Sequence, residues 1–240
     1  MRSRDTAPRH ALMTALERKD RVNIIAEFKR RSPSKGDLSR NADPVAIAKT
    51  YQLGGAVALS VLTEEDYFAG SLDDLRAVRQ AISLPILRKD FIFDEYQVYE
   101  SAAAGADALL LIVTALDDDA LVRLRTITED ELGMDALVEV HTAEELGRAV
   151  QAGARVIGVN NRDLSTFEVS LETSVQLASA APKDTVLISE SGIGSADDIQ
   201  RLRGLGYRGF LIGETLMRAD DPKELLAKFS LAQAFTPGKT

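Results

Sequence analysis

Eight short apolar runs recur along the chain, and amphipathic stretches separate them. The runs start about 27 residues apart on average, which leaves room for one helix between consecutive runs. Each run is continuously apolar, as expected for parallel strands that are buried on both faces. This repetition predicts an α/β fold in which helices cover a parallel sheet. The runs lie at residues 22–29, 56–63, 85–91, 108–113, 136–140, 156–161, 185–191 and 210–214.

The stretches between the runs carry helix start signals. Asp43 followed by Pro44 predicts an N-cap and a proline at the first helical position. Thr142, with Glu145 three residues later, predicts a capping box. Such signals predict a short helix over 11–18 and longer helices over 43–55, 71–82, 94–105, 142–153, 195–206 and 222–229.

Strand–helix units that repeat eight times without a break predict a single (βα)8 TIM barrel with a short N-terminal helix before the first strand. The alternative is an open doubly wound sheet, which usually has a Gly-rich phosphate loop after its first strand. Here KRRSPSKG follows the first strand, and this favours the barrel. We expect one domain over 1–240, with a flexible start over 1–10, the N-terminal helix over 11–18, the barrel over 22–229 and a tail over 230–240.

Composition excludes several classes of protein. The net charge of −8 argues against a nucleic-acid partner, because such proteins usually carry a basic excess. The chain has no Cys and two His, which excludes disulfides, thiolate metal sites and a cysteine nucleophile and argues against a histidine-rich metal centre. No apolar run approaches the roughly 18 residues of a membrane helix, and no secretory h-region follows the charged N-terminus. We therefore expect a cytoplasmic protein with no membrane partner.

Polar residues end most of the predicted strands. Lys89 could act as a general acid, or as a Schiff-base amine if burial lowers its pKa. Apolar flanks around Glu139 favour a raised pKa for its carboxyl group. His141 is interpreted as a loop or cap residue without a catalytic role. The strand-end residues that a barrel would gather at one mouth are Glu27, Lys29, Lys89, Glu139, Asn160, Glu190 and Ser191.

Each of these positions has a second interpretation. A single charged side chain at a strand end is often merely solvated, whereas several around one mouth would repel one another unless a site required them. Gly192 and Gly213 follow the seventh and eighth strands, where barrels often bind phosphate. Glycines in tight loops can equally be structural.

The strings AEFKRRSPSKG, LRKDF and GVNNRDL are highly specific, and with them the chain resembles the indole-3-glycerol-phosphate synthase family from about residue 11 to about residue 229. The resemblance implies a TIM-barrel lyase of tryptophan biosynthesis. Such an enzyme closes the indole ring of 1-(2-carboxyphenylamino)-1-deoxyribulose 5-phosphate with loss of CO₂ and water. It also implies a small phosphorylated substrate, no metal and no organic cofactor, and we expect a monomer.

The resemblance assigns a role to individual residues. Lys89 is implied as the general acid on the ribulose carbonyl oxygen, Glu139 as its partner carboxylate, and Lys29 as the contact of the substrate carboxylate. Glu27, Asn160 and Glu190 are implied to orient these groups. The implied phosphate and substrate positions are Ser32, Ser191, Gly192, Gly213 and Glu214, the last mainly through its backbone N–H. The implied apolar pocket for the anthranilate ring consists of Leu62, Phe68, Phe91, Leu110 and Leu164.

Two other kinds of function stay open from the sequence. One is a different phosphosugar barrel enzyme, such as a phosphoribosylanthranilate isomerase or a Schiff-base aldolase that uses Lys89. The other is a barrel that only binds a phosphorylated ligand or serves as an engineered scaffold. Every position matched to the family's catalytic groups is retained here, which disfavours the second.

Overall fold

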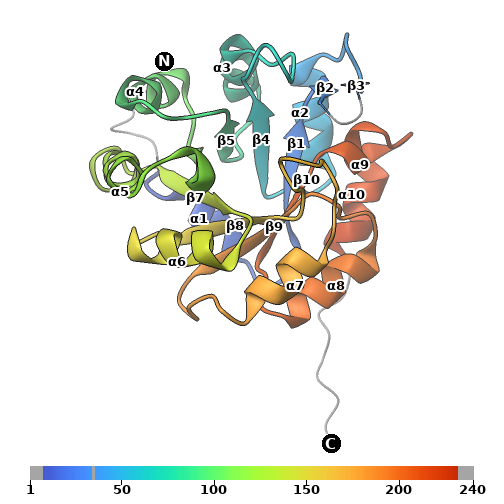
Figure 1. Ribbon diagram of the computed structural model, residues 1–240. Helices are drawn as coiled ribbons and strands as arrows, with labels where there is room; N and C mark the ends of the chain where they lie inside the picture. The colour runs from blue at the N-terminus through green and yellow to red at the C-terminus, as the bar shows by residue number, and fades with distance from the viewer. Residues whose placement is uncertain (1–7, 34–35, 232–240) are drawn as a thin grey trace, which may run out of the picture.

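Eight parallel strands form a closed barrel in the computed structural model, which describes residues 8–33 and 36–231 (Figure 1). The barrel closes because β1 (Asn23–Phe28) pairs with both β4 (Ala58–Leu62) and β10 (Gly209–Ile212). The remaining strands are β5 (Ile86–Lys89), β6 (Ala108–Ile112), β7 (Asp135–Val140), β8 (Val156–Asn160) and β9 (Val186–Glu190). Each predicted apolar run overlaps one of these strands, with ends that agree to within two residues, so the TIM-barrel prediction is confirmed.

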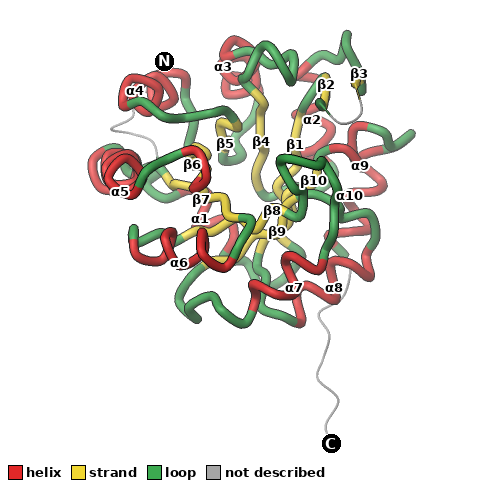
Figure 2. The backbone as a smooth tube through the Cα atoms, in the orientation of Figure 1, coloured by secondary structure: helices red, strands yellow, loops and turns green. Residues whose placement is uncertain are grey.

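Helices surround the barrel, as the tube in Figure 2 shows. The predicted helices are present as α1 (Ala11–Leu16), α2 (Pro44–Leu53), α3 (Leu72–Ala81), α4 (Glu95–Ala104), α6 (Ala143–Gln151), α8 (Ala196–Gly204) and α10 (Pro222–Ser230). The Asp43 side chain accepts from Val45 N, as expected for an N-cap. Ser195 and Asp198 form a reciprocal capping box at the start of α8.

The structure also contains elements that the sequence patterns did not predict. These are α5 (Asp118–Thr126), which continues into a π turn (Ile127–Glu131), a 3₁₀ turn (Val113–Ala115), α7 (Glu172–Ala178), α9 (Glu214–Met217) and a hairpin of β2 (Arg31–Ser32) and β3 (Gly36–Asp37). Glu214, which was predicted to end a strand, instead begins α9. α5 does carry helix signals that were not used in the prediction, namely the Asp117 N-cap and an acidic first turn.

Alternate residues of each strand belong to two separate cores. Along β1, Ile24 and Ala26 belong to the cluster that also contains buried helix residues, such as Tyr51 of α2. Ile25 belongs to a second cluster inside the barrel. This alternation follows from the period-2 geometry of a strand, so every strand is buried on both faces.

The inward positions change character along the strands. In β5 the inward Leu87 is followed two residues later by Lys89, and in β7 Leu137 is followed by Glu139. Along β9, Ile188 is likewise followed by Glu190. The amino-terminal part of the barrel interior is therefore apolar, and the charged side chains lie at the carboxyl ends of the strands.

The short helix α1 packs against the opposite, amino-terminal end of the barrel. Leu12 and Leu16 are fully buried in the interior cluster. The Asp135 carboxylate at the start of β7 accepts from Met13 N at 3.0 Å and lies 3.1 Å from His10 Nδ1. These contacts hold the predicted N-terminal helix in place.

Parts of the predicted segments lie outside the described residues. Of the start that was expected to be flexible, residues 1–7 are outside, whereas His10 is hydrogen-bonded as described above. Of the predicted tail, Ser230 ends α10, Leu231 follows it, and residues 232–240 are outside. Ser34 and Lys35 of the SPSKG loop are outside as well. Within 8–33 and 36–231, no helix is long and apolar enough to cross a membrane.

Candidate active site

A cavity of about 410 Å³ lies at the carboxyl ends of the barrel strands. Every site residue predicted from the sequence lines it. The charged and polar members are Glu27, Lys29, Ser32, Lys89, Glu139, Asn160, Glu190, Ser191 and Glu214, the glycines are Gly192 and Gly213, and the apolar members are Leu62, Phe68, Phe91, Leu110 and Leu164. The structure therefore brings together residues that are spread over 188 positions of the chain.

Lys89 lines this cavity as a cation between two carboxylates. Its Nζ lies 2.7 Å from Glu139 Oε2 and 3.2 Å from Glu190 Oε2, and its side chain is 13% exposed. Burial acts to lower the pKa of Lys89, but the charges of Glu139, Glu190 and Glu27 outweigh burial and raise that pKa above its usual value. The Schiff-base alternative required a lowered pKa, so the structure argues against it.

Glu139 is an ionised carboxylate in this environment. It accepts from Asn160 Nδ2 at 3.2 Å in addition to its contact with Lys89. The expectation of a raised pKa is wrong: burial does act in that direction, but Lys89 and His141 outweigh it and lower the pKa of Glu139. Sequence flanks indicate burial, whereas the cations that oppose it come from other parts of the fold.

Glu190 has the opposite protonation behaviour. Burial, together with the neighbouring negative charge of Glu139, raises its pKa to about 8, although Lys89 opposes the rise. Its Oε1 is buried and makes no hydrogen bond to the described residues. Gly158 on β8 faces this oxygen, and a Cβ there would overlap it. The missing side chain at Gly158 therefore makes the space that Glu190 occupies.

Lys29 and Glu27 form a second ion pair at the mouth. Lys29 Nζ donates to Glu27 Oε1 at 2.7 Å, and the pair is mostly buried. Ser60 of β4 is within 3.5 Å of the other Glu27 oxygen. Gly213 lies against the same carboxylate, because a Cβ on Gly213 would overlap Glu27 Oε1. Substitution of Gly213 would thus displace Glu27, whatever else it does to ligand binding.

The loops after β9 and β10 form another side of the cavity. Ser191 has a φ of 66° and Gly192 one of 79°, so two successive residues are left-handed, which is unusual for serine. Asn161 holds this turn, because its Nδ2 donates to the carbonyl oxygens of Glu190 and Ser191 at 2.9 and 3.0 Å. The Glu214 carboxylate lies 3.6 Å from both Arg162 Nη2 and Arg218 Nε.

The remaining wall of the cavity is apolar and partly open. Leu62 and Leu110 are buried, whereas Phe91 and Leu164 are 44% and 45% exposed at the rim. Within the described part of the chain, no group of three or more His, Cys, Asp and Glu side chains is arranged to hold a metal ion. The cavity thus combines a charged floor with an apolar wall large enough for an aromatic ring.

The sequence model of the family described as indole-3-glycerol phosphate synthase matches residues 2–229 of this chain. The chain belongs to the indole-3-glycerol phosphate synthase family. Proteins of that name from Kineococcus radiotolerans and Carboxydothermus hydrogenoformans are each 53% identical to it, over 213 and 209 residues. These matches cover 89% and 87% of this chain and 77% and 79% of the two relatives.

Distant solved structures share the fold. 3-Hexulose-6-phosphate synthase from Salmonella typhimurium superposes with a TM-score of 0.70 at 13% identity, covering 88% of this chain and 98% of that one. Thiamine phosphate pyrophosphorylase from Pyrococcus furiosus gives a TM-score of 0.65 at 16% identity, covering 87% and 93%. At such low identity these likenesses support the barrel alone.

Indole-3-glycerol phosphate synthases are lyases of tryptophan biosynthesis that act on a small phosphorylated molecule, so the enzyme class indicated by the sequence is confirmed. The structure adds cavity residues that the strand-end argument missed, including Tyr67, Arg162 and Phe167. Arg162 could have been found by the period of two, because it follows Asn160 by two residues. Tyr67 and Phe167 lie in loops, which carry no such period.

Proposed function

We propose that this cavity closes the indole ring of 1-(2-carboxyphenylamino)-1-deoxyribulose 5-phosphate, with Lys89 as the general acid. The observation that carries the proposal is the position of the Lys89 ammonium group, held by Glu139 and Glu190 at the floor of a cavity with an apolar wall. Such a group is fixed, charged and within reach of a ligand that fills the cavity.

Ring closure requires a proton on the carbonyl oxygen that the aromatic carbon attacks. That oxygen develops alkoxide charge as the new bond forms, and an alkoxide is a stronger base than an amine. An ammonium group with a raised pKa, as at Lys89, therefore remains able to protonate it. The adjacent Glu139 is ionised and 2.7 Å away, so it can accept a proton from the ring and then pass that proton to Lys89, which has given up its own.

Decarboxylation then restores the aromatic ring, and dehydration needs one proton removed and one hydroxyl protonated. Glu139 and Lys29 are the proposed groups for this step, with Glu27 fixing Lys29 at 2.7 Å. Asn160 and Glu190 orient Glu139 and Lys89 through the contacts described above. We assign to Lys29 the contact with the substrate carboxylate as well.

Binding energy comes from the two ends of the substrate. We assign the phosphate to the loops that contain Gly192, Gly213 and the backbone N–H of Glu214, which begins helix α9, with Ser32 and Ser191 nearby. The anthranilate ring packs on Leu62, Phe68, Phe91, Leu110 and Leu164. Folding a flexible substrate so that ring carbon and carbonyl meet is positioning work that a two-ended site can do.

The test is turnover of that substrate, followed by indole fluorescence, in Lys89→Ala. We expect kcat to fall by more than about a hundredfold, because a positioned general acid is lost. Glu139→Gln should also lower kcat, whereas a rise in KM alone would make Glu139 a binding group. Circular dichroism of each variant serves as the control for folding. Turnover of Lys89→Ala within a few-fold of the unmodified protein would refute the assignment.

We further propose that the protein works as a cytoplasmic monomer without metal, organic cofactor or nucleic-acid partner. The support is the Cys-free composition, the net charge of −8 and a barrel in which each proposed reacting group comes from a single chain. Light scattering after size exclusion measures the mass of the particle. A stable dimer, or activity that a chelator abolishes, would contradict this part of the proposal.

A further inference from the structure

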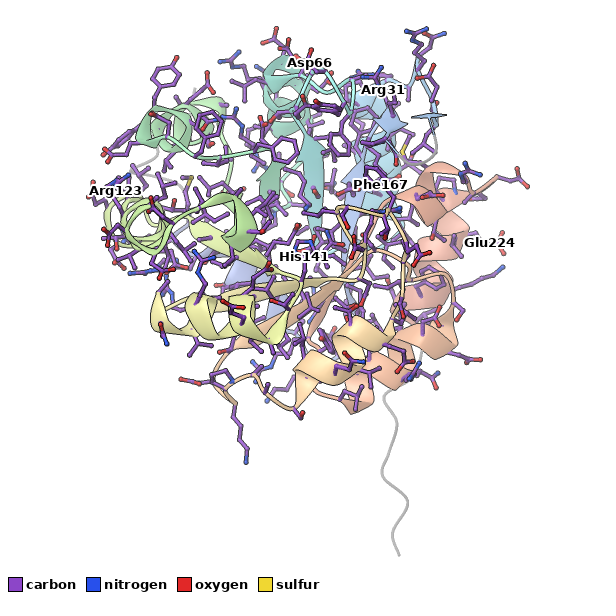
Figure 3. All side chains as sticks on the ribbon, viewed as in Figure 1. Arg31, Asp66, Arg123, His141, Phe167 and Glu224 are labelled. Atoms are coloured by element: carbon purple, nitrogen blue, oxygen red, sulfur yellow. The ribbon has the colours of Figure 1, made fainter. Side chains whose placement is uncertain are left out.

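His141 lies where the period of a strand places it beside Glu139. It follows Glu139 by two residues, directly after β7 ends, so its side chain is on the same inward side. Figure 3 labels it near the middle of the barrel, whereas Arg123 and Glu224 are labelled at the periphery. The imidazole is 13% exposed. The sequence interpretation of His141 as a mere loop or cap residue does not account for this position.

The imidazole of His141 connects two carboxylates. Its Nδ1 lies 3.2 Å from Glu145 Oε2, and the same oxygen accepts from the His141 backbone N at 2.6 Å. Its Nε2 lies 3.5 Å from Glu139 Oε1 and makes no hydrogen bond to the described residues. Glu145 was predicted to complete a capping box with Thr142. Its carboxylate instead accepts from the backbone N of His141, the residue before Thr142.

The second bond of Glu145 fixes the orientation of the ring. Because a carboxylate can only accept, the proton on the Glu145 side of the imidazole belongs to Nδ1. Nε2 is thereby directed at Glu139, and a protonated ring would donate to carboxylates on both sides. The arrangement is a carboxylate–imidazole–carboxylate chain that runs from α6 to the centre of the cavity.

The charges around Glu139 indicate what the carboxylate–imidazole–carboxylate arrangement does. Glu139 faces one cation from β5, Lys89, and is bonded by the neutral amide of Asn160 from β8. Glu190 on β9 interacts with Glu139 as a further acid and supplies no positive charge. When Lys89 gives its proton to the substrate, His141 is the remaining cation that acts on Glu139 among the described residues. An uncompensated buried carboxylate would then take up a proton or move.

We infer that His141 is a positioning residue for Glu139, and that Glu145 in turn orients His141. In its protonated form His141 is the second cation on Glu139 and keeps that carboxylate ionised and in place while Lys89 is neutral. This inference rests on the proposed role of Glu139 in the reaction and adds the group that supports it.

The experiment measures kcat and KM across pH for His141→Ala and His141→Gln with the carboxyphenylamino-ribulose phosphate. Loss of His141 should lower kcat about tenfold, less than loss of the acid itself, and leave KM within twofold. Because a positive His141 lowers the pKa of Glu139, its removal should move the acid limb of kcat to higher pH by about half a unit or more. Gln, which keeps a donor but no charge, should restore part of kcat without restoring the acid limb.

Matched controls come from the same molecule. Glu145→Gln should shift the acid limb in the same direction as His141→Gln, whereas Glu144→Gln, an exposed neighbour in the first turn of α6, should not. His10→Gln removes the only other histidine, at the opposite end of the barrel, and should also leave the limb in place. Assays are run below the melting temperature of every variant.

An unchanged acid limb with normal kcat in both His141 variants would overturn the inference. So would a rise in KM alone, which would make His141 part of the cavity wall. A lower melting temperature with an unchanged profile would show a structural role only and would overturn it equally. Failure of the proposed function appears separately, as residual turnover in Lys89→Ala.

Discussion

At the scale of single residues, the site is defined by an excess of acid over base. The Lys89 ammonium group lies within ion-pair distance of both Glu139 and Glu190. Glu27 is paired with Lys29 close by. One ammonium group cannot neutralise two buried carboxylates, so one of them binds a proton. The pKa of Glu139 is lowered and that of Glu190 is raised to about 8, which makes Glu190 the protonated member at neutral pH.

This assignment predicts a pH-dependent stability. The folded pKa of Glu190, about 8, exceeds its ordinary 4.5, so its contribution to stability is fully present below pH 4.5 and is lost as pH rises through 8. We expect the melting temperature of the unmodified protein to fall relative to Glu190→Gln between pH 5 and pH 9. Glu139 and Lys89 do not disturb this window, because the pKa of the first is lowered below 4.5 and that of the second is raised above 10.5.

Calorimetry of the two proteins at several pH values measures the effect. Taking the difference between them removes contributions from every other titrating group. Parallel curves across the window would mean that Glu190 is already ionised in the folded protein.

At the scale of the element, the important feature of β8 is Gly158, which has no side chain. Gly158 faces the Glu190 carboxylate, and a Cβ there would overlap Oε1 and approach Leu137 Cδ1 at 3.1 Å. Gly158→Ala should therefore push Glu190 away from Lys89 and lower kcat more than tenfold, as displacement of a positioned group does. It should also lower the melting temperature, because the carboxylate and its neighbours are fully buried.

Gly147 provides the control for that substitution. It lies within α6, and a Cβ there would meet no atom within 4 Å. Gly147→Ala should raise stability by about 0.5–1 kcal/mol through helix propensity and leave kcat unchanged. Thermal melts and initial rates on both variants decide the matter. Equal kcat values for the two would show that Glu190 can relocate without cost.

At the scale of the whole molecule, the two ends of the barrel have different tasks. α1 fills the amino-terminal end with Leu12 and Leu16, while the reacting groups lie at the carboxyl end. Leu16→Ala should cost about 2–5 kcal/mol, because the side chain is fully buried and leaves a cavity. Below the melting temperature, kcat and KM should stay within twofold of the unmodified protein, since no cavity-lining group moves.

Denaturant unfolding and initial rates together test this separation. Lys89→Ala should lose turnover even at temperatures where it is fully folded, although it too should be less stable, because Glu139 and Glu190 lose the cation that they share. A drop in kcat for Leu16→Ala comparable to that of Lys89→Ala would show that packing at the closed end controls the geometry of the site.

The fold and the membership of the site were determined largely by local sequence. A strand buried on both faces must be continuously apolar, so the eight runs were visible without any tertiary knowledge. The polar residues that end these runs, such as Lys89 and Glu139, had to meet at one mouth once the barrel closed. Helices α7 and α9 were harder to predict, because they are short and few of their residues are buried.

Only the tertiary structure decided what state those residues are in. Glu139 and Glu190 both end a buried strand, yet their pKa values shift in opposite directions. The difference comes from partners on other strands and helices. Lys89 from β5 lies nearer to Glu139 than to Glu190. His141, held by Glu145 of α6, lies beside Glu139 and adds to the effect of Lys89 there. Local sequence patterns specify which residues are buried and which strand side chains point into the barrel. The charge state of those side chains depends on distances across the barrel that no local pattern contains.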